Sequence, residues 1–122
     1  MTEKLEVIDT LQAFLDKVYG EASKKQDIEL KRNHGHYDYA GEKFCIYVTI
    51  FPHEVELIFE GREVGAGVFI VTLDMCTSDG EILSSDIVSV SGKSGEIKAM
   101  LVSQEALVLA QLLSLFDDLM EP

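Results

Sequence analysis

Three side chains with metal-binding chemistry fall within five consecutive residues of the sequence His34-Gly35-His36-Tyr37-Asp38. Imidazole and carboxylate groups are ligands that zinc and other divalent metals accept. If the segment is extended, His34, His36 and Asp38 point to the same side of the chain. The only other histidine is His53, and the residues around His34 are polar and turn-rich. We therefore expect an exposed loop and no metal or other cofactor, and keep a small metal- or ligand-binding enzyme that uses His34 and His36 as an alternative.

Fragments of other catalytic motifs are present, and each is incomplete. Ser91-Gly92-Lys93-Ser94 contains the Gly-Lys-Ser part of a phosphate-binding loop, but Ile87 stands where that motif requires a glycine, and we expect a strand to follow. Cys45 lies in an apolar stretch, and Cys76 precedes a polar turn. A cysteine in apolar surroundings is normally unreactive. The sequence therefore predicts a protein that is not an enzyme.

Glutamates recur at alternate positions after Pro52. Alternate residues of a strand lie about 6.6–6.8 Å apart on one face of a sheet. Such a row of carboxylates can imitate a phosphate backbone and occupy the basic groove of a nucleic-acid-binding protein, whereas the simpler reading is a solvated outer face. Ile58 interrupts the row and suits a small apolar contact. The predicted partner-binding residues are Glu54, Glu56, Ile58, Glu60 and Glu63.

The charge of the chain is strongly and unevenly acidic. Among 122 residues, 22 acids outnumber 10 bases, for a net charge of −12. Residues 1–33 are nearly balanced, so the excess lies in residues 34–122. This charge repels nucleic acid and anionic membranes, and it attracts a basic protein. No secretory signal and no apolar run of about 20 residues is expected, so the predicted location is cytoplasmic.

The hydrophobic pattern changes from a helical period to a period of two and back. Apolar residues at spacings of three and four predict a helix at 4–19, and turn residues predict a loop at 33–41 and a tight turn at Gly61-Arg62. Alternating apolar residues predict strands at 28–30, 43–51, 53–60, 64–75, 81–90 and 96–102. Ser103 is the expected N-cap of a C-terminal helix.

This C-terminal helix is apolar around much of its circumference. A helix of that kind needs burial on more than one side. One explanation is a position wedged between the sheet and the first helix. The other is a self-association face made by Leu109, Leu112, Leu113 and Phe116, which predicts a homodimer.

The order of elements predicts one α+β domain at residues 1–122. We expect a two-layer sandwich, in which an antiparallel meander of five or six strands carries both terminal helices on one face. The preferred function is a non-enzymatic protein-binding module, an inhibitor or immunity-type protein whose acidic face meets a basic, nucleic-acid-binding partner; in general shape it resembles small inhibitors of phages and mobile elements. An alternative is a dimeric chaperone for a secreted protein, since size, acidity and mixed α/β content resemble class I type III secretion chaperones, although those carry a helix between their strands.

Overall fold

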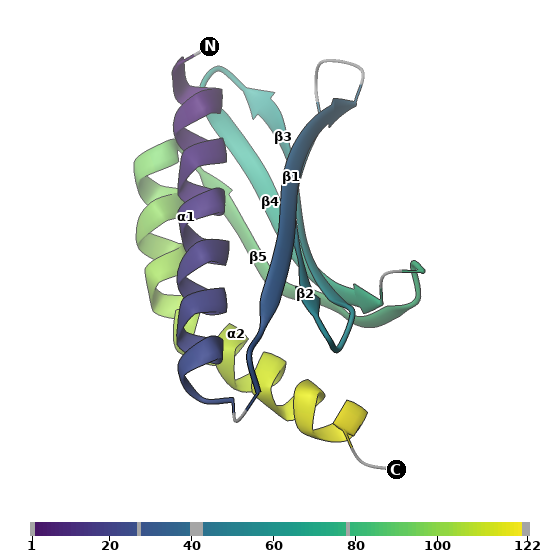
Figure 1. Cartoon of the computed structure of the whole chain (residues 1–122). Helices are drawn as coiled ribbons and strands as arrows, with labels where there is room; N and C mark the ends of the chain where they lie inside the picture. The colour runs from purple at the N-terminus through teal and green to yellow at the C-terminus, as the bar shows by residue number, and fades with distance from the viewer. Residues whose placement is uncertain (1, 27, 40–42, 78, 121–122) are drawn as a thin grey trace.

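The computed structural model describes residues 2–26, 28–39, 43–77 and 79–120. The elements follow the order α1 (Thr2–Lys24), β1 (Lys31–Tyr39), β2 (Lys43–Phe51), β3 (Val55–Gly65), β4 (Val68–Thr77), β5 (Ile82–Gly92) and α2 (Ser94–Met120). The five strands pair antiparallel in the order β1-β2-β3-β4-β5. Both helices lie on the same side of the sheet (Figure 1). The predicted α+β two-layer sandwich is therefore confirmed, with five strands.

Helix α1 is longer than its apolar pattern predicted. It extends from Thr2 to Lys24 and continues through Gly20, beyond the apolar repeat at 4–19. The hydroxyl of Tyr19 donates a hydrogen bond of 2.8 Å to the carbonyl oxygen of Leu30, which fixes the chain as it leaves the helix. The fully buried side chains of α1 recur at helical spacing and form its core face: Val7, Leu11, Leu15, Val18 and Ala22.

The register of the sheet assigns each strand residue to one of two faces. Phe44 and Ile46 of β2 are buried toward the helices, and so are Leu57 and Phe59 of β3. The ring of Phe59 meets the ring of Phe14 from α1 edge-on at 5.6 Å. The side chains between these positions point to the opposite face, which we call the open face because no described helix covers it (Figure 1).

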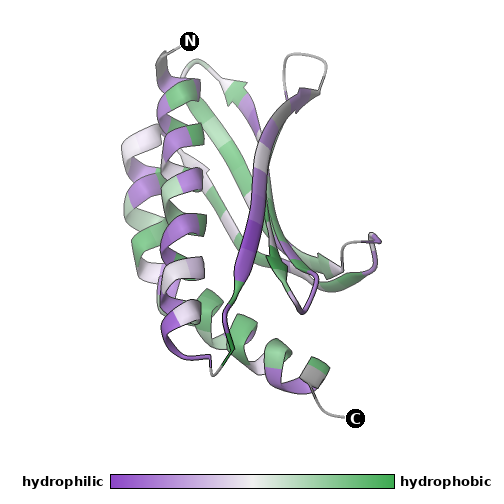
Figure 2. Ribbon diagram, in the orientation of Figure 1, coloured by the Kyte–Doolittle hydropathy of each residue, from purple (hydrophilic) through white to green (hydrophobic). Residues whose placement is uncertain are grey.

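Strand β1 corrects the prediction of a loop at residues 33–41. Residues 31–39 pair with β2 over its whole length, and residues 40–42 lie outside the described part of the chain. The strand is hydrophilic along its length (Figure 2), which suits an edge strand that must not pair with other chains. The polar residues of this segment are typical of a turn as well as of an edge strand, and for this reason a loop was predicted. The short strand expected at 28–30 is also wrong, since β1 begins at Lys31.

The turn expected at Gly61-Arg62 is absent, because both residues belong to β3. Gly61 instead makes room for the ring of Phe44 on the neighbouring strand, where an added Cβ atom would lie 2.4 Å from the ring. The chain reverses at Ala66 and Gly67, after a bulge between Glu63 and Gly65. Gly67 has φ = 73°, a left-handed conformation that glycine adopts without steric cost.

Helix α2 corrects the last predicted strand. Residues 96–102 are helical, and α2 begins at Ser94 and not at Ser103. Ile97 and Leu101 caused the error, because residues four apart share one face in a strand and in a helix alike. The local signals favour the helix. The Glu96 carboxylate accepts a hydrogen bond from the Lys93 backbone N–H at 3.1 Å, which caps the first turn, and the Ser94 hydroxyl donates to Glu6 of α1 at 2.8 Å.

The burial of α2 corrects part of the expected self-association face. Leu112 and Phe116 are fully buried in the core of the chain, and Leu109 and Leu113 are partly buried against it. Leu112 and Phe116 therefore do not belong to a surface that a second copy can reach. The N-terminal half of α2 lies beside α1, and its C-terminal half turns beneath the sheet (Figure 1).

Because α2 begins at Ser94, the apolar helix is longer than the sequence predicted. Segment Ser94–Leu119 is long and apolar enough to cross a membrane by length and composition alone. The predicted helix was too short for this, because it began only at Ser103. Core helices of globular proteins pass the same test; α2 buries Ile97, Leu101 and Val108, and 22% of the apolar segment is buried.

Candidate functional site

The open face of the sheet brings together side chains from three central strands. Ile58 of β3 lies between Tyr47 of β2 and Asp74 of β4 in the register. One step along, Glu56 lies between Thr49 and Cys76 in the same way. The face therefore combines half-buried apolar groups with carboxylates, which is the composition of a contact surface.

Glu56 is held in place by both neighbours. One carboxylate oxygen accepts a hydrogen bond of 3.1 Å from the hydroxyl of Thr49, and the other lies 3.7 Å from the Sγ atom of Cys76, which donates to it. Burial raises the pKa of the Cys76 thiol to about 11, and the adjacent charge of Glu56 and its hydrogen bond add to this effect. The thiol therefore stays protonated and the carboxylate stays fixed, so Glu56 projects a preorganised negative charge.

Asp74 has a structural role as well as a charge. Its carboxylate accepts a hydrogen bond of 2.7 Å from the backbone N–H of Asp86, where β5 leaves its regular register. Asp86 has φ = 51°, so the bulge adopts a left-handed conformation at this point. The carboxylate thus stabilises the bulge and adds a negative charge beside Ile58.

Two turns extend the negative charge beyond the strand ends. Glu54 has φ = 57° in the turn between β2 and β3, and it lines a hollow of about 240 Å³ with His53, Thr77, Asp79 and Glu81. The hydroxyl of Thr77 donates a hydrogen bond to Asp79 and lowers the pKa of that carboxyl group.

These turns and the adjoining strand ends define one acidic region. Segments 52–57 and 73–83 contain no lysine or arginine. We call their five carboxylates the acidic end of the open face: Glu54, Glu56, Asp74, Asp79 and Glu81. A basic surface placed against this end would meet negative charge from two turns and two strands.

The structure divides the predicted glutamate row. Glu56, Ile58 and Glu60 share the open face, and Glu54 lies in the turn beside them. Glu63 points to the helix side, where its carboxylate accepts a hydrogen bond of 2.9 Å from the Gly67 backbone N–H.

Two basic residues of the open face, Lys43 and Arg62, lie at its other end, whereas Lys31 of β1 lies opposite Phe51, near the turn that carries Glu54. Glu60 is exposed and shares a hollow with Lys43 and Arg62, which are paired across β2 and β3. The sequence search followed β3 alone and missed Asp74, Asp79 and Glu81. The pairing of β4 with β3 brings Asp74 beside Ile58, and Asp79 and Glu81 lie in the segment that joins β4 to β5.

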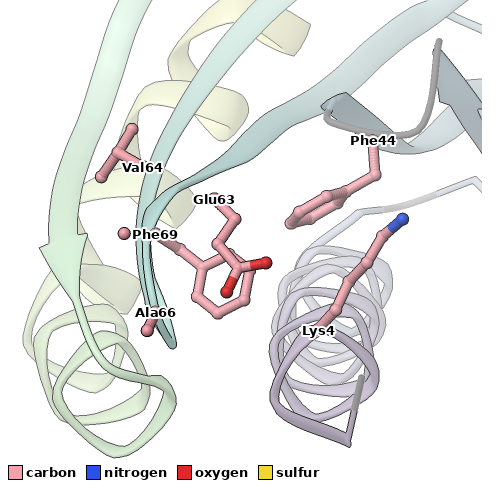
Figure 3. Close-up of a pocket in the computed structure, with 7 residues that line it drawn as sticks. Lys4, Phe44, Glu63, Val64, Ala66 and Phe69 are labelled. Atoms are coloured by element: carbon pink, nitrogen blue, oxygen red, sulfur yellow. The ribbon is translucent and has the colours of Figure 1, made fainter.

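A second hollow lies between the start of α1 and the hairpin that joins β3 to β4. It has a volume of about 430 Å³ and is lined by Lys4, Glu63 and the rings of Phe44 and Phe69; in the close-up, the Phe44 ring lies between the Lys4 and Glu63 side chains (Figure 3). The Lys4 ammonium group is paired with Asp38 at 3.0 Å, and Glu63 is bonded to the hairpin. Both charges therefore have partners within the chain: the Lys4–Asp38 pair joins α1 to β1, and the Glu63 hydrogen bond lies within the hairpin.

The histidines do not converge on one site. His34, His36 and Asp38 share the helix-facing side of β1, as expected for an extended segment. The His36 Nε2 atom lies 3.8 Å from the carboxylate of Asp38, and the same carboxylate forms an ion pair with Lys4. Within the described ranges, no group of three or more His, Cys, Asp or Glu side chains is arranged to hold a metal ion.

His53 joins the turn after β2 to the C-terminal half of α2. Its ring stacks on Phe116 with centroids 4.1 Å apart and an interplanar angle of 14°. Both ring nitrogens are buried, and no described residue forms a hydrogen bond with them. Burial lowers the pKa of His53, because a charged imidazolium would lose its hydration here.

Comparisons of this chain with models of protein families, with curated proteins and with solved structures gave no match.

Proposed function

We propose that this chain is a non-enzymatic protein-binding module that holds a basic protein surface against the acidic end of its open face. The observation that carries the proposal is the position of Glu56, Ile58 and Asp74, side by side on a sheet face that no described helix covers. A sheet face without a function in binding needs polar groups, but it does not need a carboxylate fixed by two neighbours.

The arrangement matches the anatomy of a small protein interface. Ile58 and Tyr47 are half-buried in the centre, and the carboxylates of Glu54 and Glu81 are exposed around it. Interfaces commonly place apolar or aromatic anchors inside a polar rim. The rim charges would accelerate encounter with a basic partner, and the central residues would supply the short-range contact.

The class of partner follows from the charge. Carboxylates spaced along a sheet repel phosphate groups and pair with lysine and arginine side chains. A protein that binds nucleic acid carries such a basic surface. The proposed partner is therefore a basic protein of this type, whose nucleic-acid groove the acidic end would occupy.

The test is affinity capture from the native cell with three forms of the chain. Glu54→Lys/Glu81→Lys reverses two exposed charges of the acidic end. Glu3→Lys/Asp9→Lys is the matched control, because it changes the net charge equally at exposed positions of α1. We expect one basic protein to bind the wild type and the control, and to be lost from Glu54→Lys/Glu81→Lys.

The direct contact is then measured with the purified partner. Its affinity for the wild type should fall steeply with added salt, because the Debye length shortens from about 10 Å at 0.1 M to about 3 Å at 1 M. Equal binding by both double variants would refute the proposal, and so would an affinity that salt leaves unchanged.

A further inference from the structure

The C-terminal end of α2 is held in place by its buried side chains. This half of the helix turns beneath the sheet (Figure 1), and Leu112 and Phe116 are fully buried there. The last turn carries Asp117 and Asp118 and no basic residue. Negative charges at the C-terminus of a helix oppose the helix dipole, so they do not strengthen this end. A change in the packing around Phe116 can therefore release it.

His53 is where the turn after β2 meets this end of α2. Its ring stacks on Phe116 with centroids 4.1 Å apart and an interplanar angle of 14°. Both ring nitrogens are buried, and no described residue forms a hydrogen bond with them. A protonated ring in this position would hold a full charge and two N–H donors away from water and without acceptors. The stacked position therefore accepts the neutral ring and disfavours the charged ring.

A second environment for the ring lies beside the stack. His53 also lines the hollow of about 240 Å³ that contains the carboxylates of Glu54, Asp79 and Glu81. An imidazolium ring in this hollow would form charge-assisted hydrogen bonds with carboxylates and remain in contact with water. The hollow therefore favours the charged ring, whereas the stack favours the neutral ring.

The other charged groups around the turn do not reverse this preference. Asp117 follows Phe116 on α2 and is exposed, and Glu29 and Lys31 flank the start of β1, where Lys31 lies opposite Phe51. The carboxylates around the turn outnumber this lysine. Carboxylates stay ionised between pH 5.5 and pH 7.5, whereas histidine is the side chain that titrates in this range.

We infer that His53 is a pH-sensitive switch: the neutral ring holds the C-terminal end of α2, and the protonated ring moves into the carboxylate-lined hollow and releases it. Release would expose Leu112 and Phe116, so acid would make a buried apolar surface accessible. The switch is a property of the chain alone and does not rest on the proposed function.

The direction of the pH dependence follows from the two environments. Burial lowers the pKa of His53 in the stacked position. The stacked form is therefore favoured above pH 6.5, and the released form gains as the pH falls below 6.5 toward the lowered pKa. Because one proton is involved, the ratio of the two forms changes by at most about tenfold per pH unit.

Hydrogen exchange with mass spectrometry at pH 7.5 and pH 5.5 tests the switch. Protection factors, which correct for the effect of pH on intrinsic exchange, should fall by at least about threefold in residues 112–119 at the lower pH and stay unchanged in α1. His53→Phe keeps an aromatic ring against Phe116 but cannot be protonated, so its protection factors in this segment should not change with pH. The matched control is His34→Phe at an exposed position of β1, which should respond as the wild type does.

The movement into the hollow is tested with variants outside the core, which serve also where His53→Phe is unstable. Glu54→Gln/Glu81→Gln neutralises two exposed carboxylates of the hollow, so the midpoint of release in a pH series should move to lower pH. Asp9→Asn/Glu60→Gln neutralises two exposed carboxylates away from the hollow and should leave the midpoint in place.

Three results would overturn the inference. Protection of residues 112–119 could fall equally in the wild type and in His53→Phe. It could fall to the same extent throughout α1 and α2, which would indicate global destabilisation and not a local release. The midpoint could also be the same in Glu54→Gln/Glu81→Gln as in Asp9→Asn/Glu60→Gln.

Discussion

The reactivity of Cys76 reports directly on the environment of Glu56. The pKa of this thiol is raised from 9.0 to about 11. At pH 8, a thiol with a pKa of 9.0 is about one-tenth thiolate, and one with a pKa of 11 is about one-thousandth thiolate. Because the thiolate is the nucleophile, Cys76 of the folded chain should react with iodoacetamide about 100-fold more slowly than in the unfolded chain.

The contribution of Glu56 can be separated from that of burial. Glu56→Gln removes the charge beside the thiol but leaves the site buried. The pKa of Cys76 should therefore fall part of the way toward 9.0, and alkylation of Cys76 at pH 8 should accelerate several-fold. Glu60→Gln is the control, because Glu60 lies opposite Cys45 and Thr72 and not opposite Cys76. Alkylation rates measured against pH, with peptide mass spectrometry to distinguish the two cysteines, give the pKa. If the pKa of Cys76 were unchanged in Glu56→Gln, the contact between Glu56 and Cys76 would be refuted.

The raised pKa also predicts how stability depends on pH. The folded state binds the Cys76 proton more tightly than the unfolded state. The contribution of the protonated thiol to the free energy of unfolding is therefore complete below pH 9, and it is lost as the pH rises from 9 to 11. A difference of 2 pKa units sets an upper limit of about 2.7 kcal/mol on this loss. In Cys76→Ala the loss should be absent, and urea denaturation at a series of pH values measures the difference. If the wild type and Cys76→Ala lost stability equally over this range, the tight binding of the proton in the folded state would be contradicted.

Further predictions concern the core and the turns. Phe116→Ala should lower the free energy of unfolding by about 3–5 kcal/mol because its ring is fully buried, whereas Leu107→Ala at an exposed position should cost less than about 1 kcal/mol; equal losses in urea denaturation would contradict the described orientation of α2. His53 has a lowered pKa, so the contribution of its neutral ring to the stability of the fold is complete above pH 6.5 and is lost as the pH falls through the folded-state pKa. Thermal melts of His53→Phe should lack this loss of stability at low pH, and identical pH profiles for the variant and the wild type would contradict the prediction. Gly20→Ala should stabilise α1 by about 1 kcal/mol because an added Cβ atom there contacts nothing within 4 Å, while Gly61→Ala should destabilise the sheet because its Cβ atom would collide with an aromatic ring; the opposite signs would refute the described packing.

The sequence predicted the fold well where a run of β-branched and aromatic residues is bounded by turn residues. Strand β2 has apolar residues on both faces, and its predicted bounds at 43–51 agree with the structure. The errors arose where two structures share one pattern. Ile97 and Leu101 fit both periods, and the cap formed by Glu96 decides between them. The polar residues of β1 fit either a turn or an edge strand, and only pairing with β2 decides.

The candidate site could be predicted only in part for a related reason. Alternation within one strand correctly placed Glu56, Ile58 and Glu60 on one face. Glu63 was predicted to continue the row beyond a turn at Gly61-Arg62, but β3 runs through both residues, and the odd spacing from Glu60 therefore places Glu63 on the other face. Asp74 became visible only through the register between β3 and β4, since contacts between strands depend on pairing and not on local pattern.

The central claim is that the acidic end of the open face binds a basic protein. Its most direct test is isothermal titration calorimetry of the captured partner with Glu54→Lys/Glu81→Lys and with the charge-matched Glu3→Lys/Asp9→Lys, at low and at high salt. The account predicts that only Glu54→Lys/Glu81→Lys loses affinity, by at least tenfold, and that added salt reduces this difference. Equal affinities for the two variants, or a greater loss in Glu3→Lys/Asp9→Lys, would contradict it.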